Sequence, residues 1–414
     1  MITEEHKRIG KRLMGVLTSE SINHILTSEE ISEKLSILLK EDVGVQFKHY
    51  RTGSFGNQNV LVEVISDKTY PFFLKSYPSE NGNVGENGGR IDRDVGYYGY
   101  HWLKALSEND VENVPFLFGL GKQTLEGKDY NLVLLEDSGS ESLEEELLKE
   151  KSNGVKFNLL NNAIKSLVTL HLELRKLDLR HGRALRKVED CKGEFVDHIR
   201  YYLKSINSDN LVRWEEGGGS SLYKAANPLC EIIKNESKHT IHLDFHPGNI
   251  LKNIIDFNHI GIGPKQFDIT DLVKHPAVGW IGYDEKANQL VKNYLYESLL
   301  QEGLDRAKLA ALGPTIIDEI HFSNFLKIFY FSNIIRNVRN IGFSSWLRDN
   351  DANAYNERLE FNPAYEGYRE WYLKDVGLVL NALLGDSPNS LSLTEAERAS
   401  LHGIRYGLSD YKLI

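Results

Sequence analysis

The spacing of apolar residues changes along this chain, and these changes limit the folds it can form. Val60, Val62 and Val64 alternate with other side chains, a period of two that predicts a β-strand. Beyond residue 140 the period becomes helical, as at Ile164 and Leu167, and it stays helical for most of the remaining chain. The sequence therefore predicts an α+β fold in which a small β-rich unit precedes a larger helical one.

The periodicity divides the chain into three parts. Residues 1–44 predict an amino-terminal helical extension that packs on the part that follows. Residues 45–137 predict a small antiparallel sheet with one helix, and residues 138–414 predict a mainly helical unit. The glycines at 217–219 predict a flexible loop or lid. A chain of 414 residues has room for two or three domains or for one large bilobal enzyme.

Charge, hydropathy and cysteine content argue against several classes of partner. The chain has 49 lysines and arginines against 59 aspartates and glutamates, a net charge of −10, and no dense basic run, which argues against nucleic acid as a partner. No apolar stretch approaches the ~18 residues of a transmembrane helix, and the amino-terminal residues are charged, unlike a signal peptide. Cys191 and Cys230 lie far apart and form no metal motif. We therefore expect a cytoplasmic protein with no membrane partner.

The segment from His242 to Leu251 carries the most informative polar residues. Asp244 and Asn249 are five positions apart, after a histidine and before an apolar pair, and the intervening turn places both side chains on one side of a loop. This spacing is typical of a phosphoryl-transfer loop, in which a carboxylate accepts the substrate hydroxyl and an amide oxygen binds Mg²⁺. The spacing predicts Asp244 as the general base, Asn249 as a metal ligand and His242 as a residue that braces the loop.

A second carboxylate follows on the next predicted strand. Asp256 lies seven residues after Asn249, within an Ile-Asp-Phe sequence, and a turn at Lys252-Asn253 would join two short strands. Side chains alternate between the two faces of a strand, and a hairpin of this kind keeps Asn249 and Asp256 on the same face. Their side chains can therefore converge. The spacing predicts Asp256 as the second metal ligand.

The two segments, residues 242–251 and 255–269, resemble the paired motifs of the aminoglycoside phosphotransferase and choline kinase superfamily. The members of this superfamily are small-molecule kinases with a protein-kinase-like fold. The resemblance implies a bilobal fold with a small antiparallel-sheet lobe that includes a helix and a larger, mainly helical lobe. It also implies that Asp268 is structural while Asp256 binds the metal, although a rival alignment makes Asp268 the ligand.

The resemblance extends to the amino-terminal lobe. The segment containing Gly53, Ser54, Gly56 and Asn57, followed by a strand, resembles the loop that covers the nucleotide. Lys75, in a Phe-Phe-Leu-Lys sequence, resembles the strand lysine that binds the α- and β-phosphates.

Two further parts of the lobe complete the implied nucleotide site. Asp94 resembles the helix carboxylate that pairs with this lysine, where the family usually has Glu, and Asp92 or Glu86 are alternatives. The strand before residue 138 resembles the one that leads into the adenine-binding hinge, and backbone groups near three residues would read the base: Leu134, Glu136 and Ser138.

The resemblance implies transfer of the γ-phosphate of ATP or GTP, assisted by Mg²⁺, to a hydroxyl of a small molecule. The acceptor would be an aminoglycoside, an amino alcohol, a sugar or a similar compound, and the net negative charge mildly favours a cationic one. We expect a monomer or homodimer. Two alternatives are a protein Ser/Thr kinase and a catalytically weak kinase-like module that binds nucleotide.

Several other charged residues have simpler interpretations. Glu141 and the run 144–146 are expected at a solvated helix start, where the helix dipole favours acidic side chains. Arg336 and Arg339 are expected to be solvated, with binding of an anionic substrate as the alternative. His246 is expected either to contact a phosphate or to brace the loop.

Overall fold

The computed structural model describes residues 2–18, 28–52, 58–78, 102–125, 128–181, 186–187, 191–206, 208–236, 239–301, 319–385 and 391–414. The chain forms two compact units. Unit 1 contains Met1–Ser140 and Leu251–His259, and unit 2 contains Glu141–Ile250 and Ile260–Ile414. The chain therefore enters unit 2, returns to unit 1 for nine residues after the predicted catalytic loop, and then completes unit 2.

Unit 1 is built on a five-stranded antiparallel sheet. The strands have the order β1-β2-β3-β5-β4, and β2 pairs with β3 so that Val62 lies opposite Phe72, which confirms the predicted hairpin. Helices α1 and α2 accompany the sheet, and residues 102–108 are also helical. The elements are α1 (Glu4–Thr18), α2 (Ser28–Leu39), β1 (Gly44–Thr52), β2 (Gln58–Ile65), β3 (Thr69–Pro78), β4 (Leu117–Leu125), β5 (Lys128–Glu136) and the 3-10 turn η4 (Phe257–His259).

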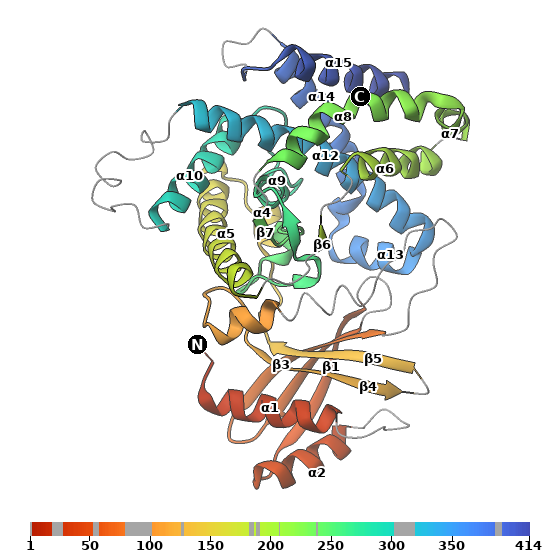
Figure 1. Ribbon diagram of the computed structural model, residues 1–414. Coiled ribbons are helices and arrows are strands. Elements are labelled where there is room, and N and C mark those ends of the chain that lie inside the picture. The colour runs from red at the N-terminus through yellow and green to blue at the C-terminus, as the bar shows by residue number, and fades with distance from the viewer. Residues whose placement is uncertain are drawn as a thin grey trace. The chain divides into compact units, whose positions relative to one another are not determined.

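Helix α1 packs directly on the sheet because glycines remove the side chains that would separate them (Figure 1). A Cβ atom at Gly10 would lie 2.3 Å from the Phe118 ring and 2.8 Å from the Phe72 ring. Apolar residues of α1, such as Leu13, are fully buried in one core cluster with residues of the sheet. The amino-terminal helices thus form part of the core of unit 1, as expected for residues 1–44.

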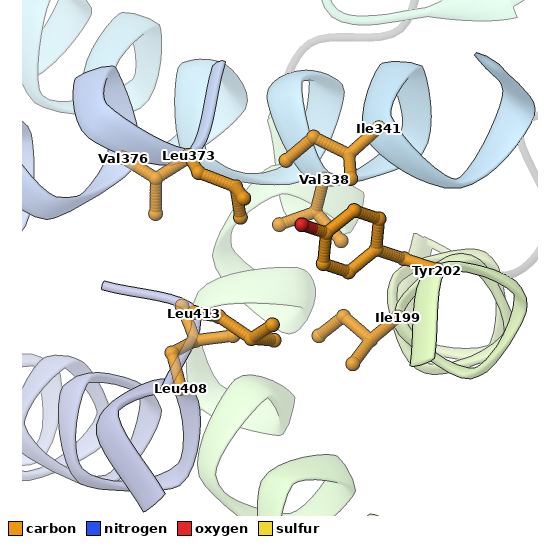
Figure 2. A pocket seen from close by; sticks show the side chains of 8 residues that line it. All are labelled: Ile199, Tyr202, Val338, Ile341, Leu373, Val376, Leu408 and Leu413. Atoms are coloured by element: carbon orange, nitrogen blue, oxygen red, sulfur yellow. The ribbon is translucent and has the colours of Figure 1, made fainter. Parts of the chain in front are cut away.

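Unit 2 is mainly helical and surrounds the long helix α12, which packs on α6, α9 and α14. A small sheet of order β6-β8-β7 pairs β8 parallel to β6 and antiparallel to β7. Figure 2 shows a small apolar cavity between α6, α12, α14 and the carboxyl-terminal residues. The elements are α4 (Leu143–Lys149), α5 (Asn153–His181), β6 (Arg186–Lys187), α6 (Cys191–Ile206), α7 (Ser208–Arg213), the π-helical turn η2 (Trp214–Gly218), α8 (Gly219–Asn235), β7 (His239–Ile241), the 3-10 turn η3 (Pro247–Asn249), β8 (Gly261–Gly263), α9 (Gln266–Val273), α10 (Glu285–Gln301), α12 (Glu319–Asn350), α13 (Ala352–Phe361), the 3-10 turn η6 (Pro363–Gly367), α14 (Tyr368–Leu384) and α15 (Glu395–Asp410).

The predicted α+β class, with a small antiparallel sheet and a larger helical part, is confirmed. The predicted glycine loop at 217–219 is wrong, because this segment lies in consecutive helical turns in which Gly217 adopts a φ of 133°. Of the helix expected at about 91–107, residues 102–108 are helical and the remainder lies outside the described residues. No helix in the described part of the chain is both long enough and apolar enough to span a bilayer.

Substitution of two glycines of α1 should change stability in opposite directions. Gly10→Ala places a methyl group against two aromatic rings, and overpacking of this kind costs about 1–3 kcal/mol. Gly15→Ala meets no heavy atom within 4 Å, so it should stabilise the helix by about 0.5–1 kcal/mol through lower backbone entropy. Urea unfolding of both variants measures the difference, and equal effects would contradict the close packing of α1 on the sheet.

Candidate active site

The predicted catalytic loop lies in unit 2 between strand β7 and strand β8. Asn249 donates a hydrogen bond from its amide nitrogen to the Asp244 backbone oxygen (2.9 Å) and to Asp244 Oδ2 (3.0 Å). The Asp244 side chain retains 28% exposure, whereas Asn249 is 8% exposed. Because the amide nitrogen of Asn249 points at Asp244, its carbonyl oxygen is the atom that could bind a cation. The structure thus brings these two residues together, as their spacing predicted.

The backbone before Asp244 is held by a buried carboxylate. Asp268 has no exposed surface and accepts hydrogen bonds from the backbone N–H groups of His242 and Leu243, both at 2.7 Å. It also accepts from His171 Nε2 at 2.8 Å. Burial lowers the pKa of His171, which keeps the imidazole neutral at pH 7. Both oxygens of Asp268 are used in bracing the loop, which is the structural role that the resemblance implied.

Arg336 holds the other side of the same peptide segment. Its guanidinium donates to the carbonyl oxygen of Leu243 at 2.9 Å and pairs with the Asp271 carboxylate. Leu243 adopts a φ of 63°, a left-handed conformation that is costly for a residue with a branched side chain. The expectation that Arg336 is solvated is wrong, because this side chain is 5% exposed. The residues before it predict a buried helix face, but only the tertiary fold shows which groups the guanidinium meets.

In unit 1, Lys75 lies on β3 and forms an ion pair with a carboxylate of the second motif. Lys75 Nζ lies 2.6 Å from Asp256 Oδ1, although the two residues are 181 positions apart. Lys75 is 9% exposed, and Asp256 adopts a φ of 62°. The structure therefore joins the lysine predicted to bind phosphate with the carboxylate predicted to bind the metal.

The residues of the predicted adenine hinge contact the segment that carries Asp256. The Glu136 carboxylate accepts from Lys252 Nζ (2.8 Å) and from the backbone N–H of Phe116 (3.2 Å). The Ser138 hydroxyl accepts from the Asn253 amide at 3.2 Å. Leu134 lies in the sheet between β3 and β4, with its side chain buried. The chain bends at 251–253, but the two short strands predicted on either side of this turn do not form, since the segment runs from the 3-10 turn η3 to the 3-10 turn η4.

Some predicted nucleotide-site residues lie outside the described residues. These residues belong to the glycine-bearing loop and to the predicted carboxylate partner of Lys75: Gly53, Ser54, Gly56, Asn57 and Asp94, together with the alternatives Asp92 and Glu86. The strands on either side of the loop are described, and Thr52 lies opposite Gln58. The loop therefore joins two adjacent antiparallel strands.

A cluster of one carboxylate and two imidazoles accompanies the catalytic loop. A carboxylate oxygen of Glu144 and one ring nitrogen each of His246 and His275 lie within 4.8 Å of one another. Glu144 Oε1 accepts from Asn362 (2.6 Å) and from the Tyr368 hydroxyl (2.7 Å). The expectation that Glu144 is solvated at a helix start is wrong, since it is 9% exposed.

The comparison with solved structures found matches at low sequence identity and with TM-scores below 0.5. An ethanolamine kinase from Plasmodium vivax is 12% identical with a TM-score of 0.47, and the alignment covers 89% of this chain and 99% of that one. The GDP complex of wild-type aminoglycoside 2'-phosphotransferase-IIIa is 12% identical with a TM-score of 0.46, and the alignment covers 83% of this chain and 99% of that one. LicA in complex with AMP is 14% identical with a TM-score of 0.42, and the alignment covers 82% of this chain and 98% of that one. No protein-family model matches the sequence, and no curated protein matches it.

Asp268→Asn should destabilise unit 2 because one oxygen that accepts from buried N–H groups is replaced by a donor. Loss of a hydrogen bond to a charged group costs about 1.5–3 kcal/mol. The matched control Asp349→Asn removes the same charge from an exposed ion pair and should change stability by less than about 0.5 kcal/mol. Thermal unfolding of both variants measures the difference, and equal effects would show that Asp268 does not hold the loop.

His275 should make stability depend on pH between about 4 and 6.5. Burial lowers the pKa of His275 to about 4, so the unfolded chain binds a proton at this position before the folded chain does. The stabilisation is therefore complete above the unfolded pKa and is lost as the pH falls through this window. The expected loss over the whole window is about 3 kcal/mol, of which about 2 kcal/mol falls between pH 7 and pH 5. Urea unfolding of the wild type and His275→Gln at pH 7 and pH 5 tests this, and parallel pH profiles would contradict it.

Proposed function

We propose that this chain is a phosphotransferase that moves the γ-phosphate of a nucleoside triphosphate to a hydroxyl of a small molecule. The observation that carries the proposal is the ion pair between Lys75 and Asp256 in unit 1. A buried lysine on a sheet strand and a carboxylate that follows an Asp244–Asn249 loop are the two charges that phosphoryl transfer requires around a triphosphate.

Asp244 is proposed as the general base. Its carboxylate is partly exposed and is oriented by the Asn249 amide, so one oxygen is held while the group can meet a substrate hydroxyl. It would accept a hydrogen bond from this hydroxyl and take its proton late in the transfer. The two backbone restraints on Leu243, from Asp268 and Arg336, support this role because positioning supplies much of the rate in such reactions.

Lys75 and Asp256 are proposed to hold the triphosphate and its metal. The pair keeps a buried ammonium neutralised, since an isolated buried charge is costly. Lys75 would bind the α- and β-phosphates, and Asp94 would be its second carboxylate partner.

The oxygen donors of Asn249 and Asp256 fit Mg²⁺, which prefers carboxylate and amide oxygens. When bound, Mg²⁺ would bridge the phosphates and offset the charge that develops on the transferred group. Backbone amides of the 53–57 loop would cover the triphosphate, and backbone groups near Leu134, Glu136 and Ser138 would read the base of ATP or GTP.

Two other functions make different predictions. A protein Ser/Thr kinase would phosphorylate peptides, but only four residues, 257–260, separate Asp256 from β8, which leaves no room for a peptide-binding activation segment there. A catalytically weak module would bind nucleotide without turnover. A screen of ATP and GTP consumption against peptides, amino alcohols, sugars and aminoglycosides separates these functions.

Asp244→Asn and Asp256→Asn should affect different steps. Loss of the base should lower turnover by about 10²–10⁴-fold while the nucleotide dissociation constant changes little. Loss of the Asp256 charge should instead weaken Mg²⁺-nucleotide binding, because a metal ligand and the partner of Lys75 are removed together. Turnover assays and calorimetric nucleotide titrations measure the two effects.

Glu63→Gln serves as the control, because Glu63 pairs with the exposed Lys48 elsewhere on the sheet. This variant should retain both turnover and nucleotide affinity. Wild-type turnover in Asp244→Asn would disprove the assigned base, and unchanged metal-nucleotide affinity in Asp256→Asn would disprove the assigned ligand.

A further inference from the structure

In the cluster of Glu144, His246 and His275, contacts with the backbone show which ring nitrogens accept hydrogen bonds and which can donate them. The backbone N–H of Gly248 donates to His246 Nδ1 (3.1 Å), and the backbone N–H of Ala277 donates to His275 Nδ1 (3.3 Å). A ring nitrogen that accepts from a backbone N–H carries no proton, so the proton of each ring lies on Nε2. The two rings therefore offer a ligand two Nε2–H donors.

Glu144 supplies the complementary acceptor. Its Oε1 is occupied by Asn362 and Tyr368, which orients the carboxylate and leaves Oε2 to face Gly248. A Cβ atom at position 248 would lie 2.7 Å from this oxygen, so glycine keeps that space open. Burial by itself would raise the pKa of Glu144, but the protonated forms of the two histidines and the hydrogen bonds from Tyr368 and Asn362 lower it. The two hydrogen bonds that Oε1 accepts favour the ionised carboxylate when the histidines are neutral.

The distances suit a bound oxygen atom. The three side-chain atoms lie within 4.8 Å of one another, so there is a point no more than about 2.8 Å from each of them, within the length of a hydrogen bond to oxygen. His246 Nε2 is 3.9 Å from Asp244 Oδ2, and both of these side chains are about 30% exposed. The cluster therefore lies beside the proposed base and reaches the surface there.

We propose that Glu144, His246 and His275 bind a second hydroxyl group of the acceptor, which makes the acceptor a neutral polyhydroxylated compound, a sugar or polyol. A hydroxyl has one O–H donor and two lone pairs, which match one carboxylate acceptor and two N–H donors. An ammonium group has donors only, so it would face the Nε2–H donors of both rings with no acceptor to offer them. An anion would oppose Glu144, and a metal ion would need nitrogen lone pairs that the backbone N–H groups and the Nε2 protons already occupy.

The proposal rests on the proposed function only in calling the bound compound the acceptor, so it can be tested without turnover. Long-range ¹H–¹⁵N spectra of the full chain, labelled at histidine, report the tautomer of each ring, with assignments from His246→Phe and His275→Phe. We expect Nε2–H at both rings. An Nδ1–H tautomer at either ring would overturn the assignment, as would loss of the Nε2 proton on titration with ZnCl₂.

The ligand class is tested by titrating the same protein with D-glucose, myo-inositol and glycerol, and with choline and ethanolamine. At least one polyol should shift the two ring signals, and Glu144→Gln should weaken this binding by about tenfold or more, as expected for a lost charged hydrogen bond. The signal of His402, which lies on α15 and stacks on Tyr406, should not move. Absence of a polyol shift, or an equal shift with choline or ethanolamine, would overturn the proposal.

Failure of this inference differs from failure of the proposed function. If a polyol binds at the rings but no compound is phosphorylated in a nucleotide-dependent reaction, the proposed phosphotransferase function is disproved and the proposed hydroxyl-binding site is supported. Phosphorylation of an amino alcohol, with no polyol effect on His246 and His275, would do the reverse.

Discussion

The carboxylate of Asp268 is the group on which the geometry of the loop at 242–251 depends. It is fully buried and accepts from two successive backbone N–H groups and from the ring of His171. Hydrogen bonds to an ionised acceptor are roughly twice as strong as those between neutral groups. They offset the left-handed backbone of Leu243, a conformation that costs about 1–3 kcal/mol. Asp244 is the next residue, so its position follows from this buried carboxylate.

Arg336 restrains the same residue from its carbonyl side. The N–H side of Leu243 is therefore held from α9 and the carbonyl side from α12, two helices that also pack on each other. Because these two restraints hold the loop, its partly exposed carboxylate can keep a fixed position even though the loop itself is short. This arrangement suits a general base, whose contribution depends on precise placement relative to the substrate.

The histidines around the loop act as neutral hydrogen-bonding groups. Burial lowers the pKa of both His171 and His275, so at pH 7 they add no positive charge. Beside the loop, the carboxylates of Asp244 and Glu144 accompany the guanidinium of Arg336, which pairs with Asp271. The charge there is therefore mixed, and the net charge of the whole chain is a poor guide to the ligand of one site.

The local patterns of the sequence were enough to predict the fold class and the contact between Asp244 and Asn249. Alternation predicted the β2–β3 hairpin because one face of a strand is buried, and the five-residue spacing predicted that Asp244 and Asn249 meet because one turn joins them. The glycine run at 217–219 was misread, since glycine permits a loop without requiring one, and here Gly217 makes a kink between consecutive helical segments.

The sequence by itself determined the interactions between residues that are near one another in the chain. Local backbone geometry fixes which of these side chains lie on the same side of a helix, strand or loop. Only the tertiary structure decided the pairing of Lys75 with Asp256 and the burial of Glu144. Glu144 satisfied a local rule for a solvated helix start, but its environment is set by Asn362 and Tyr368, which lie 218 and 224 residues further along. Burial and charge pairing at such separations depend on how whole helices pack, and no local pattern of residues contains that information.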